Sequence, residues 1–207
     1  MINLTRSLKL FVLVGIAPAC FLFCASSPQS AASTQASKTR PSSTDKSAAV
    51  FEGKDTLLRP EGYREWVFVG SSTGLSYMPN PAPAANSRED YKHVYIDPAA
   101  YREFSQTGKF PDGTVMILEV ARAAVKNEPG LQGSYSGEYI ALEASVKDSK
   151  RFPGGWAYFG FTDREGKALA KAQPFPEGAC LSCHQKKAAT DHVFTQFYPV
   201  LNAARAK

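Results

Sequence analysis

A Cys-x-x-Cys-His run near the C-terminus carries the clearest chemical signal in this sequence. It comprises Cys180, Cys183 and His184, with Leu181 and Ser182 between the two cysteines. Two thiols at this spacing can each add to a vinyl group of haem, and the adjacent histidine can then bind the iron. A thioredoxin-like redox pair would belong beside a βαβ unit, and a zinc site would need a second Cys/His pair. Neither accompanies the run, which therefore predicts one covalently attached haem c with His184 as its metal ligand.

The other axial position of that iron decides between electron transfer and ligand binding. A strong sixth ligand would favour an electron carrier, whereas an open position would favour a gas binder or a catalyst. The candidates are Met78 in a Pro- and Asn-rich loop, Met116 in an apolar strand, His93 before a strand and His192 after the haem run. Each has an ordinary role as a loop, core or surface residue. The sequence therefore predicts an open or weakly occupied position.

The N-terminal residues have the layout of a secretory signal. Arg6 and Lys9 are followed by an almost wholly apolar run from Leu10 to Phe23 and then by small residues. This predicts a signal peptide over residues 1–25 and export to the periplasm, where bacterial haem c is attached. The alternatives are an uncleaved membrane anchor and a lipid anchor at Cys20.

Composition separates a linker from the folded domain. Residues 26–50 are mostly Ser, Ala, Thr, Gln, Lys and Pro, with almost no large apolar residue. Such a segment cannot bury enough surface to offset the entropy of ordering, so we expect a disordered linker there and a folded domain over residues 51–207. The net charge of +5 is spread along the chain. Because no basic stripe with interleaved aromatic residues is present, the sequence argues against nucleic-acid binding.

Within the domain, strand signals outnumber helix signals. Asp97 as N-cap, Pro98 at the first helical position and Gly108 as terminator predict one short helix. The stretch from Glu165 to Ala172 is interpreted as a second helix. The predicted strands cover residues 66–69, 94–96, 114–120, 139–146 and 156–161. Closely spaced strands with few helices predict an α+β fold, mainly an antiparallel β-sheet with a few short helices and C-terminal haem attachment.

Several stretches outside the haem run are distinctive when they occur together. They are Gly-Tyr-Arg-Glu-Trp-Val from residue 62, Val-Tyr-Ile-Asp-Pro from 94, Thr-Gly-Lys-Phe-Pro-Asp-Gly-Thr-Val from 107, Leu-Glu-Ala-Ser-Val-Lys-Asp-Ser-Lys-Arg-Phe from 142, Val-Phe-Thr from 193 and Phe-Tyr-Pro-Val-Leu from 197. In these stretches the chain resembles the family of cytochrome P-460 and its relative cytochrome c′-beta. The resemblance extends from about Leu57 to Leu201.

This resemblance implies a mainly antiparallel β fold that packs as a homodimer. It also implies a five-coordinate haem c in an otherwise apolar pocket. Cytochrome P-460 oxidises hydroxylamine, and its haem carries an extra covalent link to a lysine on the strand after the Asp-Gly-Thr turn. Cytochrome c′-beta shares the fold, lacks that activity, and binds nitric oxide and carbon monoxide.

Leu118 occupies the position at which the resemblance places the linking lysine. Its hydrocarbon side chain cannot form the link, so this residue favours nitric oxide or carbon monoxide binding over hydroxylamine oxidation. Leu118 and Met116 lie two residues apart in a predicted strand and share a face. Both are expected to wall the haem pocket, and a plain core position is the alternative.

Two polar residues match positions of the enzyme, and the position of Glu143 lies near the distal pocket there. Glu143 corresponds to a carboxylate that can take a proton from a bound nitrogen substrate. Lys92 stands where the enzyme has an arginine, so the charge is kept but bidentate hydrogen bonding is lost. The period of a strand places Glu143 on one face with Tyr139 and Ser145, opposite the apolar residues of that strand. A solvated face is the alternative for this set.

Three functions remain open at this point. The first is a periplasmic cytochrome that binds nitric oxide, carbon monoxide or a related nitrogen oxide through cofactor-binding residues Cys180, Cys183, His184, Leu118 and Met116. The second is a hydroxylamine-oxidising enzyme with Glu143 and Lys92 as catalytic residues. The third is an electron-transfer protein with a soluble redox partner.

Overall fold

A computed structural model describes residues 48–75, 90–126 and 128–205 of the chain. These residues all belong to the compact unit Ser43–Lys207. The predicted signal peptide over residues 1–25, the first part of the predicted linker and Met78 lie outside the described residues. Ala48 and Ala49 already pack against a hydrophobic cluster of the domain. Within the described ranges, no helix is long and apolar enough to cross a membrane.

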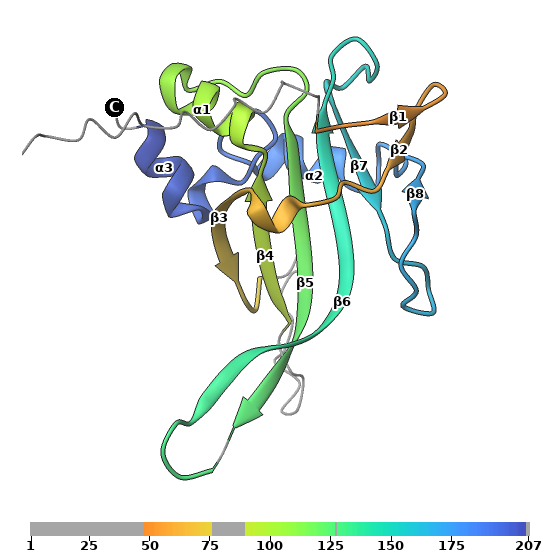
Figure 1. Ribbon diagram of the computed structural model, residues 1–207. Helices are drawn as coiled ribbons and strands as arrows, with labels where there is room; N and C mark the ends of the chain where they lie inside the picture. Colours follow the sequence, from red (N-terminus) through yellow and green to blue (C-terminus); the bar gives the residue numbers. More distant parts are fainter. Residues whose placement is uncertain (1–47, 76–89, 127, 206–207) are drawn as a thin grey trace, which may run out of the picture. The chain divides into compact units, whose positions relative to one another are not determined.

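The domain is built on a five-stranded sheet in which every neighbouring pair of strands is antiparallel. Its strands follow one another in chain order: β3 (Val67–Ser72), β4 (Tyr91–Ile96), β5 (Val115–Lys126), β6 (Gly133–Lys147) and β7 (Trp156–Gly160) (Figure 1). The strands β5 and β6 are the longest. This sheet confirms the predicted α+β class with a mainly antiparallel sheet.

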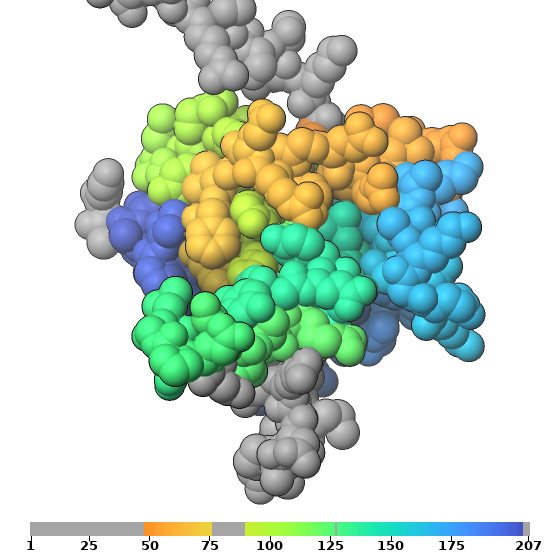
Figure 2. Space-filling model, turned by 60° about the horizontal axis from the view of Figure 1, so that its bottom comes forward, coloured from red at the N-terminus to blue at the C-terminus, as the bar shows by residue number. Residues whose placement is uncertain are grey.

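A second, three-stranded sheet joins the start of the domain to a segment near residue 170. It consists of β1 (Phe51–Glu52), β2 (Thr56–Leu58) and β8 (Lys171–Ala172). In Figure 2 the orange N-terminal strands lie against the light-blue segment that contains β8.

The helix predicted from Glu165 to Ala172 was wrong. The Asp163 carboxylate accepts hydrogen bonds from the backbone N–H groups of Glu165 (3.0 Å) and Lys167 (2.8 Å), and Gly166 has a φ of 82°. This side-chain cap competes with helical hydrogen bonding and closes a tight turn. The chain then enters β8 through the Thr162–Ala168 bridge.

The helix α1 (Pro98–Thr107) confirms the prediction made from its ends. Asp97 Oδ1 accepts a hydrogen bond from the N–H of Ala100 at 2.8 Å, and Gly108 closes the helix with a φ of 70°. Asp97 Oδ2 also accepts from the N–H of Val115 at 2.9 Å. The capping residue therefore ties α1 to the first residue of β5.

Four further short helical segments lie in the part of the chain that the structure describes. They are η1 (Tyr63–Glu65), α2 (Leu181–Lys187), η2 (Thr195–Phe197) and α3 (Pro199–Arg205). The helices α1 and α3 contact each other, α3 contacts β3, and α2 contacts β7. The three α-helices therefore lie along the large sheet.

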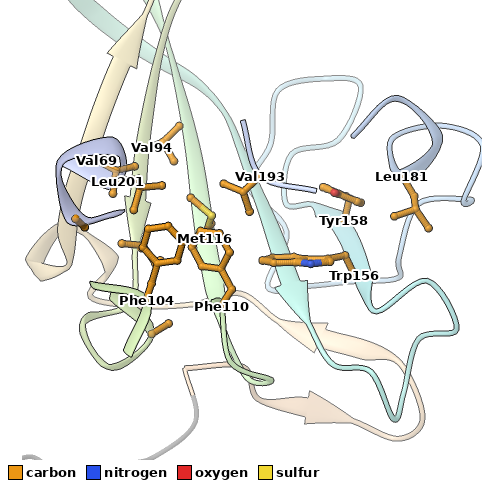
Figure 3. Close-up of a cluster of buried hydrophobic side chains, with 13 residues drawn as sticks. Val69, Val94, Phe104, Phe110, Met116, Trp156, Tyr158, Leu181, Val193 and Leu201 are labelled. Atoms are coloured by element: carbon orange, nitrogen blue, oxygen red, sulfur yellow. The ribbon is translucent and has the colours of Figure 1, made fainter. Parts of the chain in front are cut away.

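Each face of the large sheet carries its own hydrophobic cluster. The cluster on the helical side contains residues of α1, α2 and α3 together with Met116, Trp156 and Tyr158 (Figure 3). Phe104 and Phe110 stack within it at 4.1 Å between ring centroids. The other cluster lies on the opposite face and joins the small sheet to residues of β5, β6 and β7. Along these strands, its residues alternate with those of the helical-side cluster. This alternation is the period of two expected of strands buried on both faces.

A β-bulge corrects the predicted face of Tyr139. Val120 pairs with Ala141 and Ala121 pairs with Tyr139, so Ile140 is an extra residue on β6. Because a bulge shifts the alternation by one residue, Tyr139 lies on the face opposite that of Glu143 and Ser145. There its ring contacts Arg64, which pairs with Glu119 at 2.8 Å.

Candidate haem-binding site

The Cys-x-x-Cys-His run forms the start of α2. Cys180 is the N-cap, and Cys183 and His184 lie in the first turns of the helix. Both thiols are free and half-buried. Residues three apart lie on the same side of a helix, so the two thiols face the same region.

Leu181, inside the run, anchors α2 to the domain. Its side chain is buried in the helical-side cluster, where Figure 3 shows it beyond Tyr158. A Cβ atom added to Gly154 would lie 2.4 Å from Leu181 Cδ2. The absence of a side chain at Gly154 therefore leaves the space that the Leu181 side chain occupies. The packing of Leu181 against Gly154 holds in place the helix that carries the cysteines.

His184 is held in one tautomer by the protein. Its Nδ1–H donates a hydrogen bond of 2.7 Å to the backbone carbonyl of His192. Because a carbonyl can only accept, Nδ1 must carry the proton, and Nε2 keeps the lone pair that binds a metal. Burial lowers the pKa of His184, an effect that the hydrogen bond to His192 partly opposes. The neutral, ligating form of the imidazole is therefore favoured.

Two aromatic rings hold the imidazole plane. Tyr158 of β7 lies 4.5 Å and Phe194 lies 4.6 Å from the His184 ring, measured between centroids. Sequence reasoning missed both residues as part of the site. The aromatic strand at residues 156–161 and the Val-Phe-Thr stretch at residue 193 were the signals that contained them.

The haem run faces a cavity of about 340 Å³ whose other wall is the large sheet. Cys180, Cys183 and His184 line it together with Met116, Leu118 and Glu143. An adjoining cavity of about 270 Å³ shares Leu118, Cys183, Phe194 and Tyr198 with the first. Lys92 and Lys187 line this second cavity. The residues predicted to bind the cofactor or to act in catalysis thus all line one or both of these adjoining cavities.

Strand register brings the sheet residues together. Val94, Leu118, Glu143 and Gly160 are direct neighbours across β4, β5, β6 and β7. Ile96, Met116, Ser145 and Tyr158 form the next row on the same face. Since directly paired residues point to the same side of a sheet, both rows face the helical side, where α2 lies.

Glu143 is the acidic group of this wall. Its side chain is accessible from the cavity, yet enough protein surrounds the carboxyl group that burial raises its pKa, with Lys92 partly opposing the shift. Burial also raises the pKa of the Cys180 thiol, and the charge of Glu143 adds to that effect. Lys92 donates to the carbonyl of Leu75 at 3.3 Å. The Glu143 carboxyl group therefore lies close enough to Cys180 for its charge to raise the pKa of that thiol.

The structure describes three of the candidate axial ligands and places them differently. His93 lies in the β4 row that pairs with Glu119, on the face opposite the cavity, and its Nε2 hydrogen-bonds to Ser136 at 2.7 Å. His192 lines the cavity, but its contribution to His184 is its backbone carbonyl. Met116 is both a cavity wall and a buried core residue.

The sequence model for Cytochrome P460 matches residues 60–195 of this chain. The chain belongs to the cytochrome P460 family. It is accordingly a haem-containing cytochrome of that family, and the matched residues extend from just before η1 through the haem run to the start of η2. A search of curated proteins finds no match.

The residues of the site fit the haem that this family implies. The free thiols of Cys180 and Cys183 and the unprotonated Nε2 of His184 form the donor set of a c-type attachment. The adjoining cavities, walled largely by apolar and aromatic side chains, provide a hollow of the kind that holds a cofactor.

Proposed function

We propose that the chain is an exported, mono-haem cytochrome c that binds nitric oxide or carbon monoxide at a five-coordinate iron. The observation that carries this proposal is the composition of one cavity. Cys180, Cys183 and His184 line it from α2, and Leu118 lines it from the sheet. The two thiols would hold the haem, His184 Nε2 would bind the iron, and Leu118 has no nitrogen with which to form a third covalent link.

The protein's own residues would tune this haem in three ways. Burial favours the neutral form of the His184 imidazole, and the hydrogen bond from its Nδ1–H to the His192 carbonyl raises the basicity of Nε2. Leu118 and Met116 form an apolar wall that suits small neutral diatomic ligands and gives an anionic ligand little stabilisation. Bound haem supplies the iron that takes such a ligand.

Hydroxylamine oxidation is the second candidate, and Glu143 is the observation that favours it. A cavity-lining carboxyl group with a raised pKa is suited to accept a proton from a nitrogen substrate near neutral pH. Lys92 lies on the adjoining cavity and would favour the ionised carboxylate. Leu118 argues against this activity, because the family's enzyme depends on a lysine-linked haem.

The setting of this activity is part of the proposal. The N-terminal charge and hydropathy pattern supports export to the periplasm, with residues 1–25 removed as a signal peptide or kept as an anchor. We expect a homodimer, as family resemblance implies, and a soluble redox partner that reduces the haem. General electron transfer is compatible with any accessible haem c. Nucleic acid is not an expected partner.

Haem staining of the chain after denaturing gel electrophoresis tests the covalent attachment. We expect the wild-type band to retain haem, and Cys180→Ala combined with Cys183→Ala to lose it, because these are the only thiols that line the cavity among the described residues. Ser182→Ala, between the two cysteines, is the matched control and should stain like the wild type. A wild-type band without haem, or a stained double variant, would contradict the proposal.

A further inference from the structure

The carbonyl that accepts from His184 belongs to a tight two-residue turn. Thr190 and Val193 form a β-bridge, and the N–H of Val193 donates to the Thr190 carbonyl at 2.7 Å. The two central residues, Asp191 and His192, have φ values of 44° and 63°. Positive φ at both central positions is the pattern of a type I′ turn, in which Asn-Gly is the preferred sequence.

Histidine at the second central position is an unusual occupant. A non-glycine residue in the left-handed region costs free energy and persists only where the surrounding structure enforces it. The sequence Asp-His does not supply that conformation by itself. The enforcing contacts must therefore come from elsewhere in the fold.

Asp191 supplies those contacts through its side chain. Lys147 Nζ lies 2.7 Å from Asp191 Oδ2, and Trp156 Nε1 donates to Asp191 Oδ1 at 3.2 Å. Lys147 Nζ also donates to the Phe110 carbonyl at 2.7 Å. Lys147 and Trp156 are register partners at the adjoining ends of β6 and β7. The turn is thus clamped to the rigid end of the sheet at both carboxylate oxygens.

We propose that Asp191 is a positioning residue for the haem ligand, an inference that rests on the proposed function. By holding the turn, Asp191 aims the His192 carbonyl at His184 Nδ1. A fixed hydrogen bond at Nδ1 makes Nε2 a stronger donor to iron, which stabilises the ferric state and lowers the reduction potential. Lys147 and Trp156 act on His184 through their contacts with Asp191.

A direct electrostatic effect of the Lys147–Asp191 pair would have a different signature. Removing a negative charge near a haem raises its reduction potential, whereas removing a positive charge lowers it. Under the positioning account, Asp191→Ala and Lys147→Met both release the turn. Both substitutions should therefore raise the potential, and this agreement in sign separates the two explanations.

The experiment uses the full chain matured with haem. In Asp191→Ala and in Lys147→Met we expect a more positive reduction potential and an Fe–His stretching band at lower frequency in the resonance Raman spectrum of the ferrous protein. Amide exchange of the Val193 N–H should be roughly tenfold faster, because a hydrogen bond to a charged group is worth about that factor. Glu52→Ala, which breaks the exposed pair with Lys171, is the control and should change none of these.

A rescue variant tests the role of turn geometry itself. Asp191→Asn combined with His192→Gly gives the turn its preferred Asn-Gly sequence without the ion pair. We expect its reduction potential and Fe–His band to return toward the wild-type values.

Three results would overturn the inference. The first is a shift of the reduction potential in opposite directions in Asp191→Ala and Lys147→Met. The second is an unchanged Fe–His stretching band in a variant whose Val193 amide exchanges faster than in the wild type. The third is an unchanged rate of Val193 amide exchange in Asp191→Ala. A wild-type chain that carries no covalent haem would instead refute the proposed function. The inferred effect of Asp191 on the reduction potential of the iron would then be refuted as well. The exchange rate of Val193 in the haem-free full chain would then decide whether Asp191 holds the turn.

Discussion

Leu118 is the side chain on which the distinction between gas binding and hydroxylamine oxidation depends. It lies at the centre of the row Val94–Leu118–Glu143 and lines both adjoining cavities. A lysine there would place its amine against the proposed haem and near the Glu143 carboxylate. The leucine instead leaves an apolar surface.

We predict that Leu118→Lys creates an additional covalent link to the haem in at least part of the protein. The amine would enter a partly desolvated cavity, where a neutral, nucleophilic nitrogen is favoured over a charged one. The two thioether links form by addition of S–H to the vinyl groups and lose no atoms, whereas a link from the amine to the porphyrin edge replaces a C–H and an N–H and needs a two-electron oxidant such as peroxide. After treatment with that oxidant, the intact mass should therefore be lower by the mass of a hydrogen pair, and the ferrous absorption should move to the red. Leu118→Met is the volume-conserving control and should leave the mass and the spectrum as in the wild type. An unlinked haem in every Leu118→Lys molecule would contradict the prediction.

Glu143 gives the site a defined pH dependence. Burial raises its pKa, so the folded state disfavours the ionised form. The sign follows from linkage: its contribution to stability is complete below the unfolded-chain pKa and is lost as the pH rises through the higher folded-state pKa. We therefore predict that Glu143→Gln melts above the wild type at neutral pH and that the difference disappears in acid.

Thermal unfolding followed across that pH range measures this effect. Glu138→Gln changes an exposed carboxylate on the same strand and serves as the control. A difference between Glu143→Gln and wild type that grows toward acid pH would show that the carboxylate is stabilised in the folded state, contrary to the prediction.

Residue identity made part of the site predictable. The candidate haem run could be named because covalent attachment needs two thiols and a histidine at fixed spacing, and Leu118, Glu143 and Lys92 could be named as candidates because the chain resembles a family with known positions. The His192 carbonyl was not, because a backbone acceptor carries no residue signature. Its direction depends on a left-handed turn that Asp-His does not itself favour.

At the scale of elements, α2 depends on the loop that precedes β7. Gly154 lies against Leu181, and an added Cβ would lie 2.4 Å from Leu181 Cδ2. We predict that Gly154→Ala destabilises the domain by about 1–3 kcal/mol, as overpacking of a buried contact does, and reduces the fraction of chains that acquire haem. Gly178→Ala is the matched control, since a Cβ there meets nothing within 4 Å. Denaturant unfolding and haem content measure both effects, and equal values for the two variants would refute the contact's role.

Elements were predictable where local chemistry and tertiary structure agree. The helix α1 begins and ends where Asp97, Pro98 and Gly108 place it. The segment from Glu165 to Ala172 was misread because Asp163 and Gly166 close a turn that pairs Thr162 with Ala168. Likewise, the extra residue Ile140 reversed the face of Tyr139, and a single strand's periodicity cannot reveal a bulge defined by its partner.

On the scale of the whole domain, the cavities lie where the helical layer meets the large sheet. The α2 helix carries the cysteines and His184, while β5 and β6 carry Leu118 and Glu143. The sheet is extensively paired, so its wall is rigid. A preformed sheet wall suits a ligand site in which only small molecules enter beside the haem.

The absorption spectrum of the ferrous protein, recorded before and after addition of nitric oxide or carbon monoxide, tests the central claim most directly. The account predicts the spectrum of an ordinary five-coordinate haem c that changes on addition of either gas, because Leu118 cannot link to the porphyrin and an apolar wall faces the open position. A spectrum shifted far to the red before any addition would reveal a third covalent link. A spectrum that neither gas alters would reveal a firmly held sixth ligand, and either result would contradict the account.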